Sequence, residues 1–231
     1  MITCDLYVCV NMENYREIID KLRYNGYKIL GIYMDSTQNR QLWSKIQEYT
    51  QSSEMKIYRK NIINNVESLK RGILKERNRE ISSISLSIIG KVEKRILEKI
   101  KIVTIDNFDN VNIEISNYLI KLIRRTHIFV EVPITRLIKY ISKLLNENRY
   151  SIIKINSIIK VMYEANRRRR LILSSGASSK DEVLDPKLIC LINAGFLNLK
   201  NFDLTPISTN VLCMLAMVGL YEIRKEAIYR I

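Results

Sequence analysis

The feature that most limits the fold is a regular alternation of strand-like and helix-like segments along the whole chain. Runs rich in β-branched residues are each followed by a segment whose apolar residues recur at helical spacing, about seven times at intervals of roughly 25–35 residues. The predicted strands lie at 3–10, 27–34, 55–63, 81–89, 102–105, 127–132 and 171–173. No proline- or glycine-rich linker interrupts them, which is typical of one parallel α/β domain.

The length of 231 residues and the number of repeats favour a TIM-like (β/α) barrel that spans residues 1–231 as a single domain. An open doubly wound sheet is the alternative. The first strand-to-helix turn, residues 8–14, contains no glycine, so the dinucleotide-binding fingerprint of such sheets is absent.

Composition excludes several other classes of protein. The longest apolar run, Val211 to Leu220, is ten residues, whereas a membrane-spanning helix needs about 20. No charged segment precedes an apolar stretch at the N-terminus, so we expect no secretory signal and a cytoplasmic location. The four cysteines form no C-x-x-C pair, which excludes zinc-ribbon and thioredoxin sites and indicates reduced thiols.

The positive charge is concentrated in two blocks. The net charge is +14, and residues 56–101 carry +8 while residues 136–180 carry +9, the remainder being slightly acidic. Two concentrated blocks suggest a binding surface for a polyanion, with solvated helix faces as the simpler alternative. An anionic membrane surface is a weaker option, because neither block has an apolar face rich in Trp and Phe beside it.

Two motifs in the second block are candidate phosphate contacts. The run Arg167, Arg168, Arg169 and Arg170 ends a predicted helix, where the helix dipole favours cations and where guanidinium groups can bind phosphate bidentately. The small residues Ser174, Ser175 and Gly176 follow the last predicted strand and precede Lys180. They predict either a backbone-amide anion site or merely a tight turn.

Other titratable residues give no convincing catalytic site. The only histidine, His127, has no evident base or metal partner, so we expect it to face solvent or to be structural. Carboxylates near predicted strand ends could serve a metal-dependent phosphoesterase, or could cap helices and pair with basic residues. They are Asp5, Asp35, Asp106, Glu131 and Asp185. With one histidine, the sequence favours no metal site on the chain.

The segment that starts at Leu171, LILSSGASSKDEVLDPKLICLINAGF, resembles a strand–SSGA–helix signature of the PHP-like barrel subunit of ribonuclease P. In archaea that family is ribonuclease P protein component 3, which is related to the thirty-kilodalton subunit of the eukaryotic enzyme. Supporting matches are the opening CDLYV, the NGYKILGI segment at Asn25–Ile32, Val130–Val132 and Ile207–Asn210. The H-x-H motif of metal-dependent PHP enzymes is Asp5-Leu6-Tyr7 here, and the family's Arg-Ser-Pro is Leu184-Asp185-Pro186.

The resemblance implies a non-catalytic subunit of a ribonucleoprotein that removes the 5′ leader from precursor tRNA. The catalyst would be the RNA with its Mg²⁺, and the chain itself would bind no cofactor. The implied partners are ribonuclease P RNA, precursor tRNA, the small ferredoxin-like component 2 and other ribonuclease P proteins, with no membrane.

We therefore predict that Arg167, Arg168, Arg169, Arg170 and Lys180 contact RNA phosphates beside an anion site shaped by Ser174, Ser175 and Gly176. A second, more diffuse patch is predicted at Lys56, Arg59, Lys60, Lys70, Arg71, Lys75, Arg77 and Arg79. The alternatives are a metal-dependent phosphoesterase on the same barrel and, less favoured, a barrel enzyme for a small phosphorylated metabolite.

Overall fold

The computed structural model describes residues 2–34, 39–67, 80–147, 151–199, 201 and 203–218. Within them, parallel strands alternate with helices. The strands are β1 (Thr3–Val10), β2 (Tyr27–Met34), β3 (Lys56–Ile63), β4 (Glu80–Ser85), β5 (Ile102–Thr104), β6 (Phe129–Pro133) and β7 (Leu171–Ser174). The α-helices are α1 (Tyr15–Tyr24), α2 (Asn39–Thr50), α4 (Lys94–Ile100), α5 (Ile113–Arg125), α6 (Ile134–Glu147), α7 (Ser151–Arg167), α8 (Pro186–Leu197) and α9 (Thr209–Met217). Short 3₁₀ helices are η1 (Leu86–Lys91), η2 (Phe108–Asn110), η3 (Lys180–Glu182) and η4 (Thr205–Ile207).

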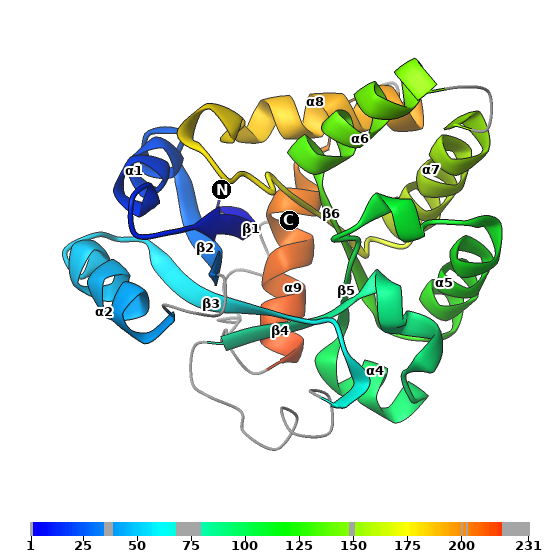
Figure 1. The fold of residues 1–231 in the computed structure, drawn as a ribbon, viewed down its shortest axis with the longest axis horizontal. Helices are drawn as coiled ribbons and strands as arrows, with labels where there is room; N and C mark the ends of the chain where they lie inside the picture. Colours follow the sequence, from blue (N-terminus) through cyan, green and yellow to red (C-terminus); the bar gives the residue numbers. More distant parts are fainter. Residues whose placement is uncertain are drawn as a thin grey trace.

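The strands form one parallel sheet in the order β1-β2-β3-β4-β5-β6-β7. The sheet curls into a nearly closed barrel, because the chain just after β7 returns to β1. There the amide of Gly176 donates to the carbonyl of Tyr7 at 2.9 Å, and the amide of Cys9 donates to the carbonyl of Ala177 at 2.8 Å. The structure confirms the predicted single-domain TIM-like barrel (Figure 1).

The helices follow from amphipathic spacing and local caps. In α1, the apolar residues Ile18, Ile19 and Leu22 are fully buried against the sheet. The side chain of Asn112 caps α5 by accepting a hydrogen bond from the amide of Ile115, and Asp185 caps α8 through the amide of Lys187. These caps fix where each helix begins after its strand.

The end of the barrel where the strands begin is filled with apolar side chains. Inward-facing residues near the strand starts form one buried cluster with α9. They are Cys4, Leu6, Ile29, Tyr58, Ile81, Ile102, Phe129 and Ile172, which meet Val211, Met214 and Leu215. In Figure 1, α9 lies across the middle of the ring of strands, and this contact places it as the closure of the N-terminal end.

The predicted strand at 81–89 is wrong in its second half. Its Ile/Ser alternation continues to Ile89, but β4 ends at Ser85, whose hydroxyl accepts a hydrogen bond from the amide of Ser87. That cap turns the chain into η1, which buries Leu86, Ile88 and Ile89. The spacing of Val66, Leu69 and Ile73 also predicts a helix, most of which lies outside the described residues. Within the described ranges, no helix combines the length and apolar character needed to cross a bilayer.

Candidate nucleic-acid interface

A cluster of guanidinium groups surrounds one buried carboxylate where α5 and α7 end. Glu164, whose side chain is 6% exposed, lies one turn before the end of α7. Arg124 of α5 donates to both of its oxygens, with Nε–Oε1 and Nη2–Oε2 distances of 3.1 Å. Arg168 Nε and Arg167 Nη2 donate to the same Oε1 at 2.9 and 3.1 Å. Three arginines from two helices are thereby held in one place.

The rest of the arginine run turns around the end of α7. Arg169 has a left-handed backbone, with φ of 55°, and its exposed side chain leaves the helix axis. Arg170 turns inward, where Nη1 donates to the carbonyl of Ile123 at 2.8 Å and Nη2 lies 3.2 Å from His127 Nδ1. Arg125 is exposed at the end of α5, next to Arg124 in the chain. We call Arg124, Arg125 and Arg167 to Arg170 the arginine cluster.

The electrostatics of the arginine cluster suit a phosphate ligand. Donation by Arg124, followed by that of Arg168 and Arg167, lowers the pKa of Glu164 to about 2, so its carboxylate stays ionised at any physiological pH. The side chains of Arg124 and Arg167 remain 53% and 55% exposed. Glu164 uses only some of their donors, so the remaining N–H groups can face a polyanion.

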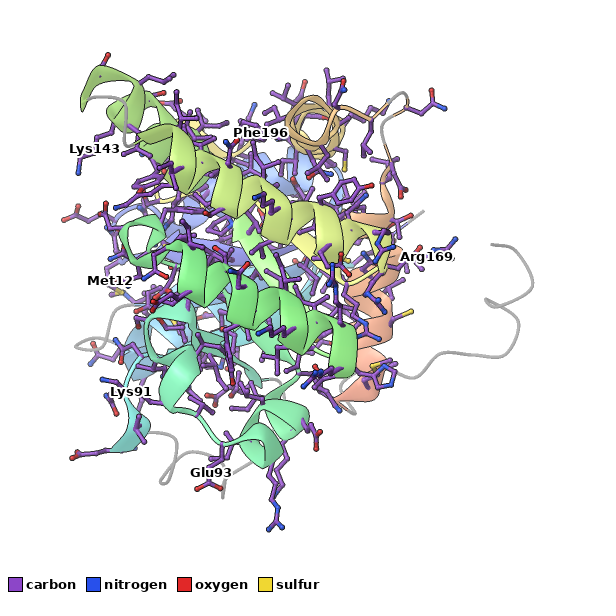
Figure 2. All side chains as sticks on the ribbon, turned by 90° about the vertical axis from the view of Figure 1, so that its right-hand side faces the viewer. Met12, Lys91, Glu93, Lys143, Arg169 and Phe196 are labelled. Carbon is purple, nitrogen blue, oxygen red and sulfur yellow. The ribbon has the colours of Figure 1, made fainter. Side chains whose placement is uncertain are left out.

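The other predicted motif lies at the opposite end of β7. Arg170 precedes the strand and Ser174 is its last residue, so the strand separates the two motifs instead of bringing them together. Ser174 and Ser175 are fully buried, and only Lys180 of this group is exposed. In Figure 2, Arg169 lies toward one end of the barrel, whereas Met12, which follows β1, lies toward the other together with Lys91 and Lys143.

The backbone amides of the Ser-Ser-Gly-Ala segment already have acceptors within the chain. The amide of Ser175 donates to Asp5 Oδ1 at 3.1 Å, that of Gly176 to Tyr7, and that of Ala177 to its neighbour Ser175 Oγ at 3.1 Å. Gly176 has φ of 67°, and a Cβ there would lie 2.5 Å from that of Pro133. The small residues close the barrel between β7 and β1, and an anion would have to displace these hydrogen bonds. Whether RNA contacts this segment stays a prediction.

One member of the second predicted patch is not on the surface. Lys60 points into the barrel, where its Nζ donates to Glu131 Oε2 at 2.6 Å and both side chains are fully buried. Thr104 donates to the same carboxylate oxygen at 2.7 Å. The prediction of Lys60 as an RNA contact is therefore wrong. Side chains alternate along β3, and Lys60 lies on the same inward face as the buried Tyr58. Of the rest, Lys56 is exposed and Arg59 half-buried, while Lys70, Arg71, Lys75, Arg77 and Arg79 lie outside the described residues.

The strand-end carboxylates do not converge in the described part of the chain. Asp185 caps α8, Asp106 accepts from Ser85 Oγ at 2.8 Å, and Asp5 accepts two amides. Asp35 lies outside the described residues. Among the residues that are described, no group of three or more His, Cys, Asp and Glu side chains could hold a metal ion.

Sequence reasoning found the four arginines at 167–170 but missed the other residues at this site, which are Arg124, Arg125 and Glu164. Glu164 stands three and four residues before Arg167 and Arg168, a helical spacing that could have indicated ion pairs. Arg124 and Arg125 gave no such signal, because their contact with Glu164 depends on α5 packing beside α7. His127, predicted to face solvent or to be structural, is exposed, and its Nδ1 lies 3.2 Å from Arg170 Nη2.

Comparisons with known proteins give a structural match without a sequence match. No protein-family model matches the chain, and no curated protein does. A chain in a cryo-EM structure of archaeal ribonuclease P with mature tRNA has a similar fold, with a TM-score of 0.62 and 13% identity. The match covers 94% of this chain and 96% of that one. At this identity the likeness shows that the two chains share the barrel fold over nearly their whole lengths.

Proposed function

We propose that the chain is a protein subunit of ribonuclease P of the component 3 type, which supports RNA-catalysed removal of the 5′ leader from precursor tRNA. The observation that carries this proposal is the fold similarity, over 94% of this chain, to a chain of an archaeal ribonuclease P bound to tRNA. The resemblance of the segment around Ser174–Ala177 to the same family supports it independently, because that inference used sequence alone.

The arginine cluster supplies the chemistry that this function needs. In the proposal, the exposed guanidinium groups of Arg124, Arg167 and Arg168 bind phosphates of the ribonuclease P RNA or of the precursor tRNA. Glu164 holds these groups in position. The chain acts in the cytoplasm as a scaffold without its own cofactor, pairs with the small ferredoxin-like component 2 and other ribonuclease P proteins, and leaves Mg²⁺ and cleavage to the RNA.

Reconstitution tests the proposal. A 5′-labelled precursor tRNA is incubated with Mg²⁺, a cognate ribonuclease P RNA and the small partner subunit, with and without this chain. We expect leader removal to rise only when chain, partner and RNA are all present. The control is the chain alone with Mn²⁺ and a generic phosphodiester. Cleavage by the chain alone would favour the phosphoesterase, and no effect in the complete mixture would reject the proposal.

A further inference from the structure

A groove runs along the outer surface between α5 and α7. The two helices lie side by side in Figure 2 and run in the same direction, with Arg124 beside Glu164. The groove has a volume of about 230 Å³. Its lining includes Ile113, Ser116 and Asn117 of α5 and Ile153, Asn156 and Lys160 of α7. Pockets that enclose whole drug-sized ligands measure roughly 300–1,000 Å³, so this groove suits a smaller group.

The lining combines apolar walls with polar edges. Ile113 and Ile153 are 55% and 49% exposed at the groove, which is unusual for isoleucine. The floor holds Ser116 Oγ, which is buried and has no hydrogen-bond partner among the described residues. Asn117 and Asn156 also line the groove, and both residues are exposed. A flat ring with apolar faces and hydrogen-bonding edges matches this arrangement, and an unstacked nucleobase is such a ring.

The groove is continuous with the arginine cluster. Ile120 and Lys160 line its near end, and Arg124 and Glu164 follow four residues later on the same helices. Four residues of α-helix span about 6 Å, so a phosphate at the arginine cluster and a base in the groove fit neighbouring nucleotides of one strand. Basic residues outnumber acidic ones on these two helices. The acidic residues are Glu114 and Glu164, and the basic residues are Lys121, Arg124, Arg125, Lys154, Lys160 and Arg167. This charge favours RNA over an acidic protein segment.

We propose that the groove between α5 and α7 holds one unstacked base of a single-stranded RNA segment whose phosphates bind the arginine cluster. The inference rests on the proposed function only in that RNA is the ligand. Asn117 and Asn156 hydrogen-bond the edge of the base, and the two isoleucines contact its faces.

Binding of short RNA to the full chain tests this inference. The probe is a fluorescently labelled adenosine octamer, compared with octamers that carry one abasic nucleotide at each position in turn. The groove variant Asn117→Leu/Asn156→Leu keeps side-chain size but removes both amides. We expect it to bind the octamer about tenfold more weakly, with an unchanged salt dependence, because a paired base edge is worth about that factor. The matched control, Gln47→Leu on the exposed face of α2, should bind like wild type.

The abasic series identifies the groove as the site. We expect one abasic position to weaken binding to wild type and to have no effect on the groove variant. Ile153→Trp fills the groove from its exposed wall and should reproduce the loss without disturbing the core. Equal affinities and equal abasic profiles for wild type and both variants would overturn the inference and leave the groove to a protein partner. If Arg168→Ala/Arg169→Ala also leaves affinity and salt dependence unchanged, the proposed RNA-binding function fails with it.

Discussion

Asp5 shows at the scale of one residue how closing the barrel costs stability. Its carboxylate is fully buried between β1 and β7, where Oδ1 accepts two amides and Oδ2 has no partner among the described residues. Burial raises the pKa to about 7 from the ordinary 3.8, against the opposing effect of the Ser175 and Tyr7 hydrogen bonds. The folded protein therefore holds this proton more tightly than the unfolded chain, and stability falls as the pH rises from about 4 to about 7.

We predict that Asp5→Asn removes the fall in stability between pH 4 and pH 7 that the buried Asp5 causes. Relative to wild type, the variant should gain up to roughly 4 kcal/mol in unfolding free energy between pH 4 and pH 8. Urea unfolding of both proteins at pH 4, 6 and 8 measures the difference. A difference that does not change with pH would show that folding does not raise the pKa of Asp5.

Arg169 is a second residue whose conformation conflicts with local preference. Its φ of 55° at the end of α7 is a position that glycine usually occupies, since a side chain there costs about 1 kcal/mol. We predict that Arg169→Gly keeps or raises the melting temperature while weakening RNA binding several-fold. Asn198→Gly is the matched control, because Asn198 is also left-handed, with φ of 51°, and ends α8, outside the arginine cluster as defined above. Equal RNA binding by wild type and Arg169→Gly would remove Arg169 from the RNA-binding surface.

At the scale of elements, periodicity predicted most of the barrel. The strands expected at 3–10 and 27–34 coincide with β1 and β2, because their apolar runs are buried on both faces. The predicted strand at 81–89 is too long by four residues. Its last apolar residues are buried equally well when the chain forms the 3₁₀ helix η1. The sequence does not predict that α9 closes the barrel. Its residues are nearly all apolar, so their spacing does not indicate which face is buried or what it packs against.

The helix α9 makes a sharp prediction about packing. Met214 is fully buried at the N-terminal end of the barrel, whereas Met217, one turn later, is 52% exposed. Met214→Ala should lower the unfolding free energy by about 2–5 kcal/mol because it leaves a cavity, and Met217→Ala should change it by less than about 0.5 kcal/mol. Chemical unfolding of the two variants measures the contrast. Equal losses would mean that α9 does not close the barrel.

The sequence predicted individual motifs of the candidate site but not which of them lie together. Only three residues separate the arginine run from the Ser-Ser-Gly-Ala segment, but they belong to β7, so the two motifs lie at opposite ends of that strand. Conversely, Arg124 and Glu164 are 40 residues apart and in contact. Short motifs can be recognised from the local sequence, whereas a contact between two helices depends on how the barrel places them side by side.

The whole molecule has exposed cations at both ends of the barrel, with Arg169 at one end and Lys91 and Lys143 at the other. Barrel enzymes place their chemistry where the strands end. Here that end holds the hydrogen-bonded seam between β7 and β1, and the arginine cluster lies beside α9 at the other end. An RNA-binding surface on the outside of a barrel does not have to lie where the strands end, as barrel active sites do. Phosphate contacts need only exposed cations spaced like the phosphates of the RNA backbone.

Salt dependence tests which end binds RNA. In Arg168→Ala/Arg169→Ala, Arg124 and Arg167 still hold Glu164, so the fold should persist while two phosphate contacts are lost. The slope of log affinity against log salt concentration should then fall by about 1.4 for single-stranded RNA, at about 0.7 per phosphate. Lys91→Ala/Lys143→Ala removes the same charge from exposed sites at the opposite end and should leave the slope within its error. If the lysine pair lowers the slope and the arginine pair does not, RNA binds at the end of the barrel where the strands finish.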